Sequence, residues 1–331
     1  MLTVYHYQHW ADGAPTQSIL SVLPSKMAHK NDTESSLGAA ERSDRIALLV
    51  TYINIVLYAV CFQLQRPVEP FLVKLLSQEG DSAKVARTYG RLQSFFNAVQ
   101  TIGSPLVGIL LDRVGIKKAS FVVFAATALS YAILASSTTM HLLFLSKIPT
   151  FLQAAFLVAQ ATAATATGGD AAARAKALGR MTTAYTCGAT IGPALGGWLA
   201  DQGDLYFSAK LAVVGSFVSA ILSLLYLPDA HHASNEKKDR KDVNSSLSLR
   251  NSLAIGLRPS VWPLLMVKLI GGVVASMHST ALPLVLTQSV HFEASQLGIS
   301  MSTSMFAVAI FAALFMSPLV KRIGPDGVSK F

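Results

Sequence analysis

The chain has 331 residues, of which 52% are hydrophobic and only 14% are charged, and its formal net charge is +9. Soluble domains carry charges on about a quarter of their residues, so this composition excludes a typical soluble protein. The positive charge does not indicate nucleic-acid binding, because the Lys and Arg residues are divided among many loops and form no single basic face. The sequence therefore predicts an all-α fold, a polytopic membrane protein built as a helix bundle.

Residues 1–45 are polar and mixed, and they lack the basic start and apolar core of a cleavable signal peptide. We expect a disordered cytoplasmic tail there. Eight apolar segments follow, each near the ~20 residues needed to cross ~30 Å of hydrocarbon. The predicted spans are 46–72, 88–111, 119–138, 142–166, 181–200, 207–227, 261–287 and 296–320.

The basic residues predict the orientation of these spans. Of the 27 Lys and Arg residues, 19 lie in the tail and in the loops 112–118, 167–180, 228–260 and 321–331. Loop 73–87 is the exception, with three bases on the opposite side. Because cytoplasmic loops are enriched in Lys and Arg, we expect a cytoplasmic N-terminus. The pattern favours neither the plasma membrane nor an endomembrane.

The first span carries two charges, Arg66 and Glu69. They come about 20 residues after the span begins, which at about 1.5 Å per residue places them near the outer surface. Charges within spans are costly and are functional candidates. These two side chains could form an i,i+3 pair at a cavity mouth, or each could reach out to the polar interface.

Three amides mark the second span. Gln93, Asn97 and Gln100 are spaced i, i+4 and i+7, so they share one face of an otherwise apolar helix. Polar groups in hydrocarbon need partners or water. This face is predicted either to line a central cavity or to bond another helix.

The segment 108–118, G-I-L-L-D-R-V-G-I-K-K, predicts a tight charged turn between the second and third spans. Its glycines permit close approach, its acid can attract a helix N-terminus, and its bases hold the turn on the cytoplasmic side. An ordinary basic loop is the alternative. The residues concerned are Gly108, Asp112, Arg113, Gly115, Lys117 and Lys118.

Two further spans carry a single base each. Lys147 lies about 8 Å into the fourth span from outside, and Lys268 lies roughly 10 Å into the seventh span from the cytoplasm. Both are candidate functional charges because of the cost of placing them in hydrocarbon.

The fifth span is marked by glycine rather than by charge. Three of its glycines recur every four residues and make one helix face without side chains, and a proline can bend the helix there. This glycine face could serve close helix packing, or it could have a role in transport. The residues concerned are Gly188, Gly192, Pro193, Gly196 and Gly197.

These motifs resemble those of major facilitator superfamily transporters. The pattern G-x-x-x-D-R-x-G-x-K-K at 108–118 is similar to the family's cytoplasmic latch between two halves, with Ile116 where a base is usual. The glycine motif of the fifth span resembles that of proton-coupled drug antiporters. Lys147 is similar to the base that these antiporters carry in their fourth span, where Arg is usual and where Phe151 replaces a glycine.

Shorter matches resemble the organic cation transporter-like solute carriers of family 22. They cover roughly residues 46–324 and include the match at Lys268, which on this resemblance is the leading intramembrane candidate. The matching pieces are S-K-I-P at 146–149, A-L-G-R at 177–180, L-G-G at 195–197 and V-K at 267–268.

A hydrophilic linker at 228–260 divides a six-helix lobe, 46–227, from the start of a second lobe at 261–331. The segment 321–324, K-R-I-G, echoes D-R-V-G at 112–115 with an offset of 209 residues. A duplicated six-helix unit would give this offset. We therefore expect about eight of twelve spans here, either because the sequence is truncated or because the product is a shortened one.

The resemblance implies a monomeric multi-pass transporter that moves small organic solutes by alternating access, with proton-coupled efflux of organic cations or drugs. Its partners would be the solute and the lipid bilayer, and a proton gradient rather than a cofactor would drive it. A facilitative carrier of organic anions is one alternative, because Glu69 is the one acid among the candidate charges of the spans, against the three bases Arg66, Lys147 and Lys268. A non-transporting regulator or binding partner is the other. No enzyme motif or metal-ligand spacing is seen, so we expect neither catalysis nor a metal.

Overall fold

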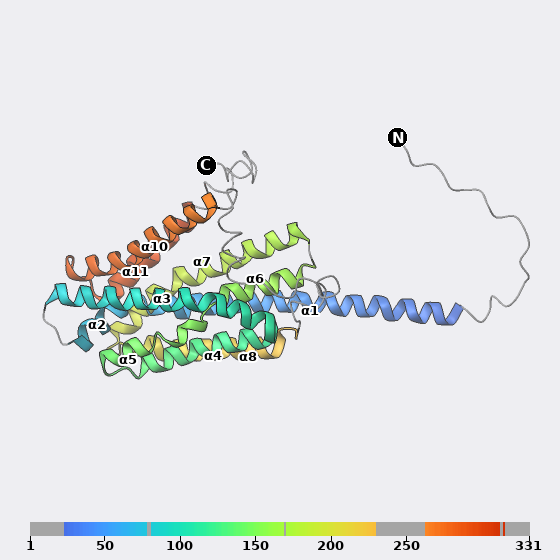
Figure 1. The fold of residues 1–331 in the computed structure, drawn as a ribbon, viewed down its shortest axis with the longest axis horizontal. Coiled ribbons are helices and arrows are strands. Elements are labelled where there is room, and N and C mark those ends of the chain that lie inside the picture. The colour runs from blue at the N-terminus through green and yellow to red at the C-terminus, as the bar shows by residue number, and fades with distance from the viewer. Residues whose placement is uncertain (1–22, 78–80, 169, 230–261, 312–313, 315–331) are drawn as a thin grey trace, which may run out of the picture. The chain divides into compact units, whose positions relative to one another are not determined.

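The structure is a computed structural model in which the backbone is described for residues 23–77, 81–168, 170–229, 262–311 and 314 (Figure 1). Side chains are described from Glu41 onward, except those of residues 264, 265 and 268. The regular elements in these ranges are all helices. They are α1 (Leu23–Leu64), α2 (Glu69–Ser77), α3 (Ser82–Val114), α4 (Ile116–Ala135), α5 (Met140–Leu145), the 3₁₀ helix η2 (Pro149–Leu152), α6 (Ala155–Ala166), α7 (Ala171–Asp201), α8 (Phe207–Tyr226), α10 (Trp262–Gln288) and α11 (Ala294–Phe311).

Seven candidate spans among the described residues are long and apolar enough to cross a membrane, which confirms the predicted all-α membrane fold. The predicted number was eight, and the difference is α7. This helix has 31 residues, but its many Gly and Thr residues lower its mean hydropathy. The seven spans are Glu41–Ser77, Ser82–Val114, Ile116–Ala135, Met140–Ala166, Phe207–Tyr226, Leu269–Gln288 and Ala294–Phe311.

The N-terminal segment differs from the expected disordered tail, because α1 begins at Leu23 and is helical through residues 23–45. Good helix formers such as Ala39, Ala40 and Glu41 favour this conformation locally. The chain divides into two compact units, residues 1–44 and 45–331, and all that follows concerns the second. The predicted linker from 230 onward and the echo at 321–324 lie outside the described residues.

Two of the predicted spans are broken rather than continuous. The first is interrupted by turns at Gln65–Val68, between α1 and α2, and the fourth is divided into α5, η2 and α6. Each break contains a proline, Pro67 or Pro149. Proline has no N–H to donate and its ring clashes with the preceding turn, so an α-helix cannot run through it undisturbed. Both breaks lie at the level of the buried charges described below.

The helices pack through small residues. Helix α4 runs along α8, and α7 runs along α11. On α7 the glycines at 188, 192 and 196 lie against α1: a Cβ at Gly188 would come 2.7 Å from the Cβ of Ala59, and one at Gly192 would come 2.6 Å from the Cβ of Gln63. On the side facing α11, a Cβ at Gly197 of α7 would overlap the backbone of Ala294. Helix α7 therefore fits closely between α1 and α11.

Among the described residues, four hydrogen bonds join α10 and α11 to α3 and α7. The side chain of Asn97 donates to Ser276 Oγ over 3.0 Å, and that of Gln288 donates to the Ser82 carbonyl over 3.0 Å. The backbone N–H of Ala194 donates to Ser302 Oγ over 2.9 Å, and that of Ser295 donates to Asp201 Oδ2 over 3.3 Å. All four contacts lie in one half of the second unit, which extends from the middle of α3 to the end at which α7 terminates, residue 201.

At the opposite end, near the Gly115 turn, the same helices expose large apolar side chains. On α3, Ile102 is 64% exposed, and on α10 Val267 is 70% and Ile270 is 62% exposed. In Figure 1, α10 rises away from α3 toward this end. Within the described residues, the hydrogen bonds of α10 and α11 to the first lobe thus lie toward the residue 201 end.

Candidate functional site

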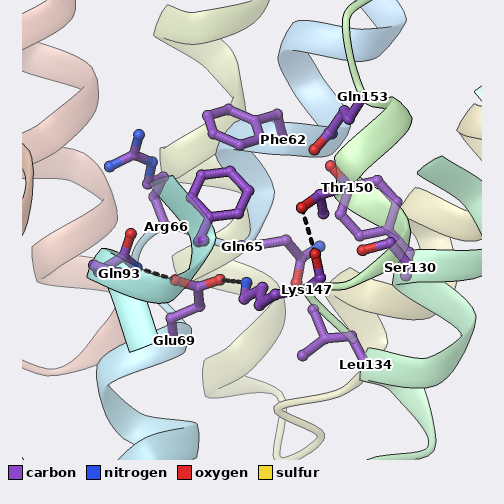
Figure 2. A pocket seen from close by; sticks show the side chains of 12 residues that line it. Phe62, Gln65, Arg66, Glu69, Gln93, Ser130, Leu134, Lys147, Thr150 and Gln153 are labelled. Carbon is purple, nitrogen blue, oxygen red and sulfur yellow. Dashed lines mark hydrogen bonds and ion pairs between the residues drawn. The ribbon is translucent and has the colours of Figure 1, made fainter. Parts of the chain in front are cut away.

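A buried ion pair joins the two broken spans. Lys147 Nζ contacts Glu69 Oε1, and the second carboxylate oxygen of Glu69 accepts a hydrogen bond from Gln93 Nε2 over 2.6 Å (Figure 2). Glu69 is 5% and Lys147 is 7% exposed. Such charges remain buried only when they are paired and hydrogen-bonded. Three predicted spans, the first, second and fourth, therefore meet at one polar centre.

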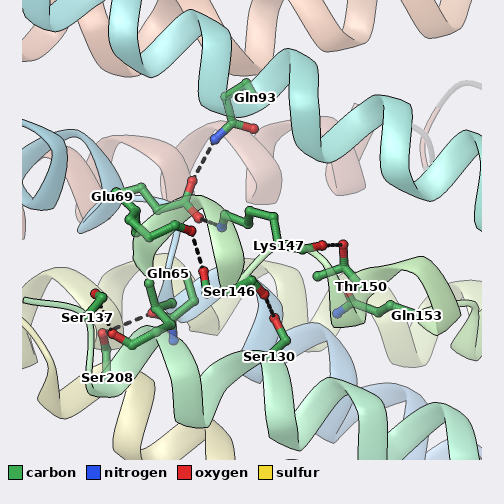
Figure 3. A network of polar contacts seen from close by, with 12 residues as sticks. Gln65, Glu69, Gln93, Ser130, Ser137, Ser146, Lys147, Thr150, Gln153 and Ser208 are labelled. Carbon is green, nitrogen blue, oxygen red and sulfur yellow. Dashed lines mark hydrogen bonds and ion pairs between the residues drawn. The ribbon is translucent and has the colours of Figure 1, made fainter. Parts of the chain in front are cut away.

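The breaks in these spans place the two charges. Glu69 is the first residue of α2, where the positive end of the helix dipole favours a carboxylate. Lys147 lies between α5 and η2, where the backbone carbonyls of the break are capped by hydroxyls: Ser130 Oγ donates to the Ser146 carbonyl over 2.7 Å, and Thr150 Oγ1 donates to the Lys147 carbonyl (Figure 3). The side chains thus satisfy backbone groups that a continuous helix would satisfy itself.

One glycine makes room for the broken span. A Cβ at Gly103 on α3 would overlap the carbonyl oxygen of Phe151 in η2. Gln100 Nε2 on the same helix donates to Gln153 Oε1 over 3.3 Å. Helix α3 and η2 therefore lie in close backbone contact beside the ion pair.

Aromatic rings cover the charges. Phe62 and Phe96 lie with their ring centroids 6.0 Å apart. The Arg66 guanidinium carbon is 5.1 Å from the centroid of Phe62, and Lys147 Nζ is 5.4 Å from that of Phe96. Both bases therefore make cation–π contacts, which strengthen where water is excluded.

These groups surround a small cavity, shown in Figure 2. Its volume is about 20 Å³, room for about one water molecule but not for an organic solute. The wall is polar on one side and aromatic on the other. It is formed by Phe62, Gln65, Arg66, Glu69, Gln93, Phe96, Ser130, Tyr131, Leu134, Lys147, Thr150 and Gln153.

The three amides of α3 all bond other helices, which is one of the two predicted outcomes. Gln93 bonds Glu69, Asn97 bonds Ser276, and Gln100 bonds Gln153. Gln93 also lines the cavity. The stripe therefore serves three different partners rather than one site.

Arg66 and Glu69 do not form the predicted i,i+3 pair. The carboxylate of Glu69 is held by Lys147 and Gln93, and the Arg66 guanidinium points away from it in Figure 2. This expectation is not met because regular α-helix is interrupted at residues 65–68, so regular helical i,i+3 spacing does not hold between them. Glu69 is also buried rather than at the polar interface.

The predicted latch forms the turn between α3 and α4. Gly115 has φ of 83°, a conformation that strongly favours glycine, and its N–H donates to the Leu111 carbonyl. Lys117 Nζ lies 3.4 Å from Asp229 Oδ2 beyond the end of α8. The remaining members are separated from the polar centre: Asp112, Arg113 and Lys118 are exposed, and a Cβ at Gly108 would meet open space.

Of the other predicted residues, those of the fifth span serve helix packing, and the side chain of Lys268 is not described. The glycines of the fifth span form the seam of α7, and the Pro193 carbonyl lies against Gly298 of α11. Lys268 lies on α10, but its side chain is outside the described part of the structure. Among the described residues, no group of three or more His, Cys, Asp or Glu side chains could hold a metal ion.

Sequence reasoning missed Phe62, Gln65, Phe96 and Gly103. Phe62 lies at i and Arg66 at i+4, a spacing that brings a ring and a base together on a helix. That signal was present in the sequence. The contact between Gly103 and η2 had no sequence signal, because it depends on the break at Pro149.

The family model described as Major Facilitator Superfamily matches residues 51–328. The chain belongs to the Major Facilitator Superfamily. This accords with the prediction that the chain is not an enzyme, and it supports a multi-pass membrane protein.

Individual relatives are more distant. The chain is 28% identical to "Solute carrier family 22 member 18" of Mus musculus over 262 residues, 77% of this chain and 63% of that protein. It is 27% identical to "Tetracycline resistance protein, class G" of Vibrio anguillarum, over 77% of this chain and 64% of that protein. The resemblance to family 22 solute carriers is confirmed. The chain spans less than two thirds of the length of these relatives.

Among solved structures, the chain is similar to that of the human organic anion transporter MFSD10 (TETRAN). The TM-score is 0.61 with 19% sequence identity, over 86% of this chain and 74% of that chain. At this identity the likeness concerns the fold alone. It agrees with the all-α bundle described above.

Proposed function

We propose that the protein transports a small organic solute across a membrane by alternating access, with proton exchange at Glu69 driving solute efflux. The buried pair of Glu69 and Lys147 is the observation that carries this proposal. Transporters of this architecture place their solute and coupling-ion sites near the bilayer midplane, on broken helices. Glu69 and Lys147 both lie at such breaks.

Proton binding has a defined consequence at this pair. A proton on Glu69 removes the negative charge that holds Lys147, and a buried cation without its partner is strongly unfavourable. Lys147 would then need a new partner or access to water, which a change of conformation can supply. Proton binding and the change of conformation are coupled in this way, and protons that move inward down their gradient can drive the solute outward. Relatives named for tetracycline and multidrug resistance support efflux as the direction.

The membrane orientation, the oligomeric state and the role of the latch turn complete the proposal. We take the N-terminus as cytoplasmic, so that the Gly115 end faces the cytoplasm, and we propose that this state is the one accessible from that side. The transporter acts as a monomer in the bilayer. The latch turn would close the cytoplasmic side when the cavity opens outward, with Asp112 and Arg113 free to contact the second half.

Transport in proteoliposomes tests the proposal. The full chain is reconstituted with an acidic interior, and tetracycline uptake is measured with the pH gradient and after its collapse by an ionophore. We expect gradient-driven accumulation by the native chain, and its loss in Glu69→Gln, which cannot exchange a proton. Glu293→Gln, an exposed acid at the start of α11, is the matched control and should behave as native.

Uptake that is the same with and without the gradient would replace proton coupling with facilitated diffusion. Absence of uptake by the native chain, in liposomes where the protein is folded, would favour a non-transporting membrane protein.

A further inference from the structure

We infer that the solute bound at this cavity is an organic anion, with its carboxylate on Arg66 and an apolar ring beside Phe62 and Phe96. The inference rests on the proposed function, because it takes the cavity as the solute site. It concerns the sign of the cargo, for which the family resemblance implied a cation.

The charges of the cavity wall are the first reason. The lining contains one acid, Glu69, and two bases, Arg66 and Lys147. Glu69 and Lys147 neutralise each other in their ion pair. The excess charge of the wall is therefore positive and belongs to Arg66, which makes no ion pair with any residue that the structure describes. A solute with one negative charge would complete the balance.

The second reason is that the groups that could hold a cation are already engaged. One oxygen of the Glu69 carboxylate contacts Lys147 and the other accepts from Gln93. The ring of Phe62 holds the Arg66 guanidinium, and that of Phe96 holds Lys147 Nζ. An organic cation would have to displace one of the protein's own bases from a buried partner, which leaves that base unpaired.

The third reason is the supply of donors. A guanidinium carries five N–H donors in a planar fork that matches a carboxylate. In the structure one face of this group is occupied by Phe62, which leaves its edge available. Gln65 lines the same cavity and is 4% exposed; its Oε1 accepts from Ser208 Oγ over 3.4 Å, and its Nε2 has no hydrogen-bond partner within the described residues. A buried donor of this kind favours a ligand with acceptor oxygens.

The geometry also indicates the body of the solute. Phe62 and Phe96 form one wall, and the cavity of about 20 Å³ must widen before a ring can enter. Separation of the two rings would admit a flat apolar group between them, at the distance at which aromatic rings stack. An aromatic carboxylate of one or two rings fits this arrangement.

Three probes that share one ring system test the sign of the cargo. Binding of 2-naphthoate, 2-naphthamide and 2-naphthylmethylammonium to the full chain in nanodiscs is measured by isothermal titration calorimetry. We expect 2-naphthoate to bind at least ten-fold more tightly than the other two. Equal binding of the three probes, or tighter binding of the ammonium compound, would overturn the inference.

Variants assign the preference to Arg66. Arg66→Met keeps the length of the side chain and removes its charge, so we expect 2-naphthoate to bind about ten- to a hundred-fold more weakly, with 2-naphthamide little changed. Arg66→Lys should restore part of the preference for the anion. Arg91→Met removes an exposed base of α3 outside the cavity and is the matched control. Native binding by Arg66→Met would place the anion elsewhere and contradict the assignment.

These results are separable from those on transport. Gradient-driven tetracycline uptake without a preference for 2-naphthoate would refute the anion and leave the transport proposal standing. A preference for 2-naphthoate that depends on Arg66, in a chain whose transport ignores the pH gradient, would support the anion and refute the coupling.

Discussion

Glu69 illustrates how far a single residue can be read from the sequence. A carboxylate within an apolar segment predicted a functional charge, and the structure places it at the centre of the candidate site. Its partner could not be predicted, because Lys147 is 78 residues away in the chain. Both bases were named from the sequence, but the spacing suggested a pair only with the nearest one, Arg66. Local spacing identifies which charges matter, whereas the fold decides which of them meet.

Gly103 supports a prediction at the same scale. Gly103→Ala should lower the free energy of unfolding by about 1–3 kcal/mol, because its methyl group would collide with the Phe151 backbone and force α3 away from η2. Gly90→Ala on the same helix meets no atom within 4 Å, and should be neutral or stabilising by about 0.5–1 kcal/mol. Thermal unfolding in detergent compares the two. Equal melting temperatures would mean that η2 does not contact α3 closely.

At the scale of elements, hydropathy located the spans but not their interruptions. The fourth span was predicted as one helix over 142–166, and it is α5, η2 and α6. The sequence shows Pro149, but a proline can either kink a helix or end it. Which of the two occurs depends on the tertiary contacts of the freed backbone groups. Here Ser130 and Thr150 cap the freed carbonyls. The positions of Ser130 and Thr150 relative to Pro149 match no known sequence motif, so these caps could not be predicted.

Helix α7 shows the opposite case. Its glycine spacing predicted a close packing face, and the structure places that face against α1. The same glycines lower its hydropathy, which removes it from the helices that qualify as spans by composition. Because glycine has no side chain, it allows close helix packing and also lowers the mean hydropathy from which a membrane span is predicted.

At the scale of the whole molecule, the proposed function would assign the contacts between α10, α11 and the first lobe to one state of a transport cycle. They lie toward the residue 201 end, where Gln288 bonds the Ser82 carbonyl, while apolar side chains are exposed at the Gly115 end. Alternating access requires that these contacts break when the cavity opens on the other side.

Cysteine cross-linking checks this state. In a chain with Cys187, which is exposed, replaced by Ser, the pair Asn97→Cys and Ser276→Cys should form a disulfide readily, because these side chains are in contact. The cross-link should abolish tetracycline uptake, and reduction should restore it. The pair Ile109→Cys and Val267→Cys, both exposed at the Gly115 end, should not cross-link. The reverse pattern would mean that the chain rests in the opposite state.

The buried pair of Glu69 and Lys147 holds the candidate site together, and a double-mutant cycle measures the interaction between the two charges. Thermal unfolding of the native chain, Glu69→Gln, Lys147→Met and the double variant gives their coupling free energy. Each single variant leaves a buried charge without its partner and should cost about 3–5 kcal/mol, whereas the double variant should cost less than the sum. A coupling above about 1 kcal/mol would support the pair. Strictly additive losses would show that the two charges do not meet, and would contradict the site described here.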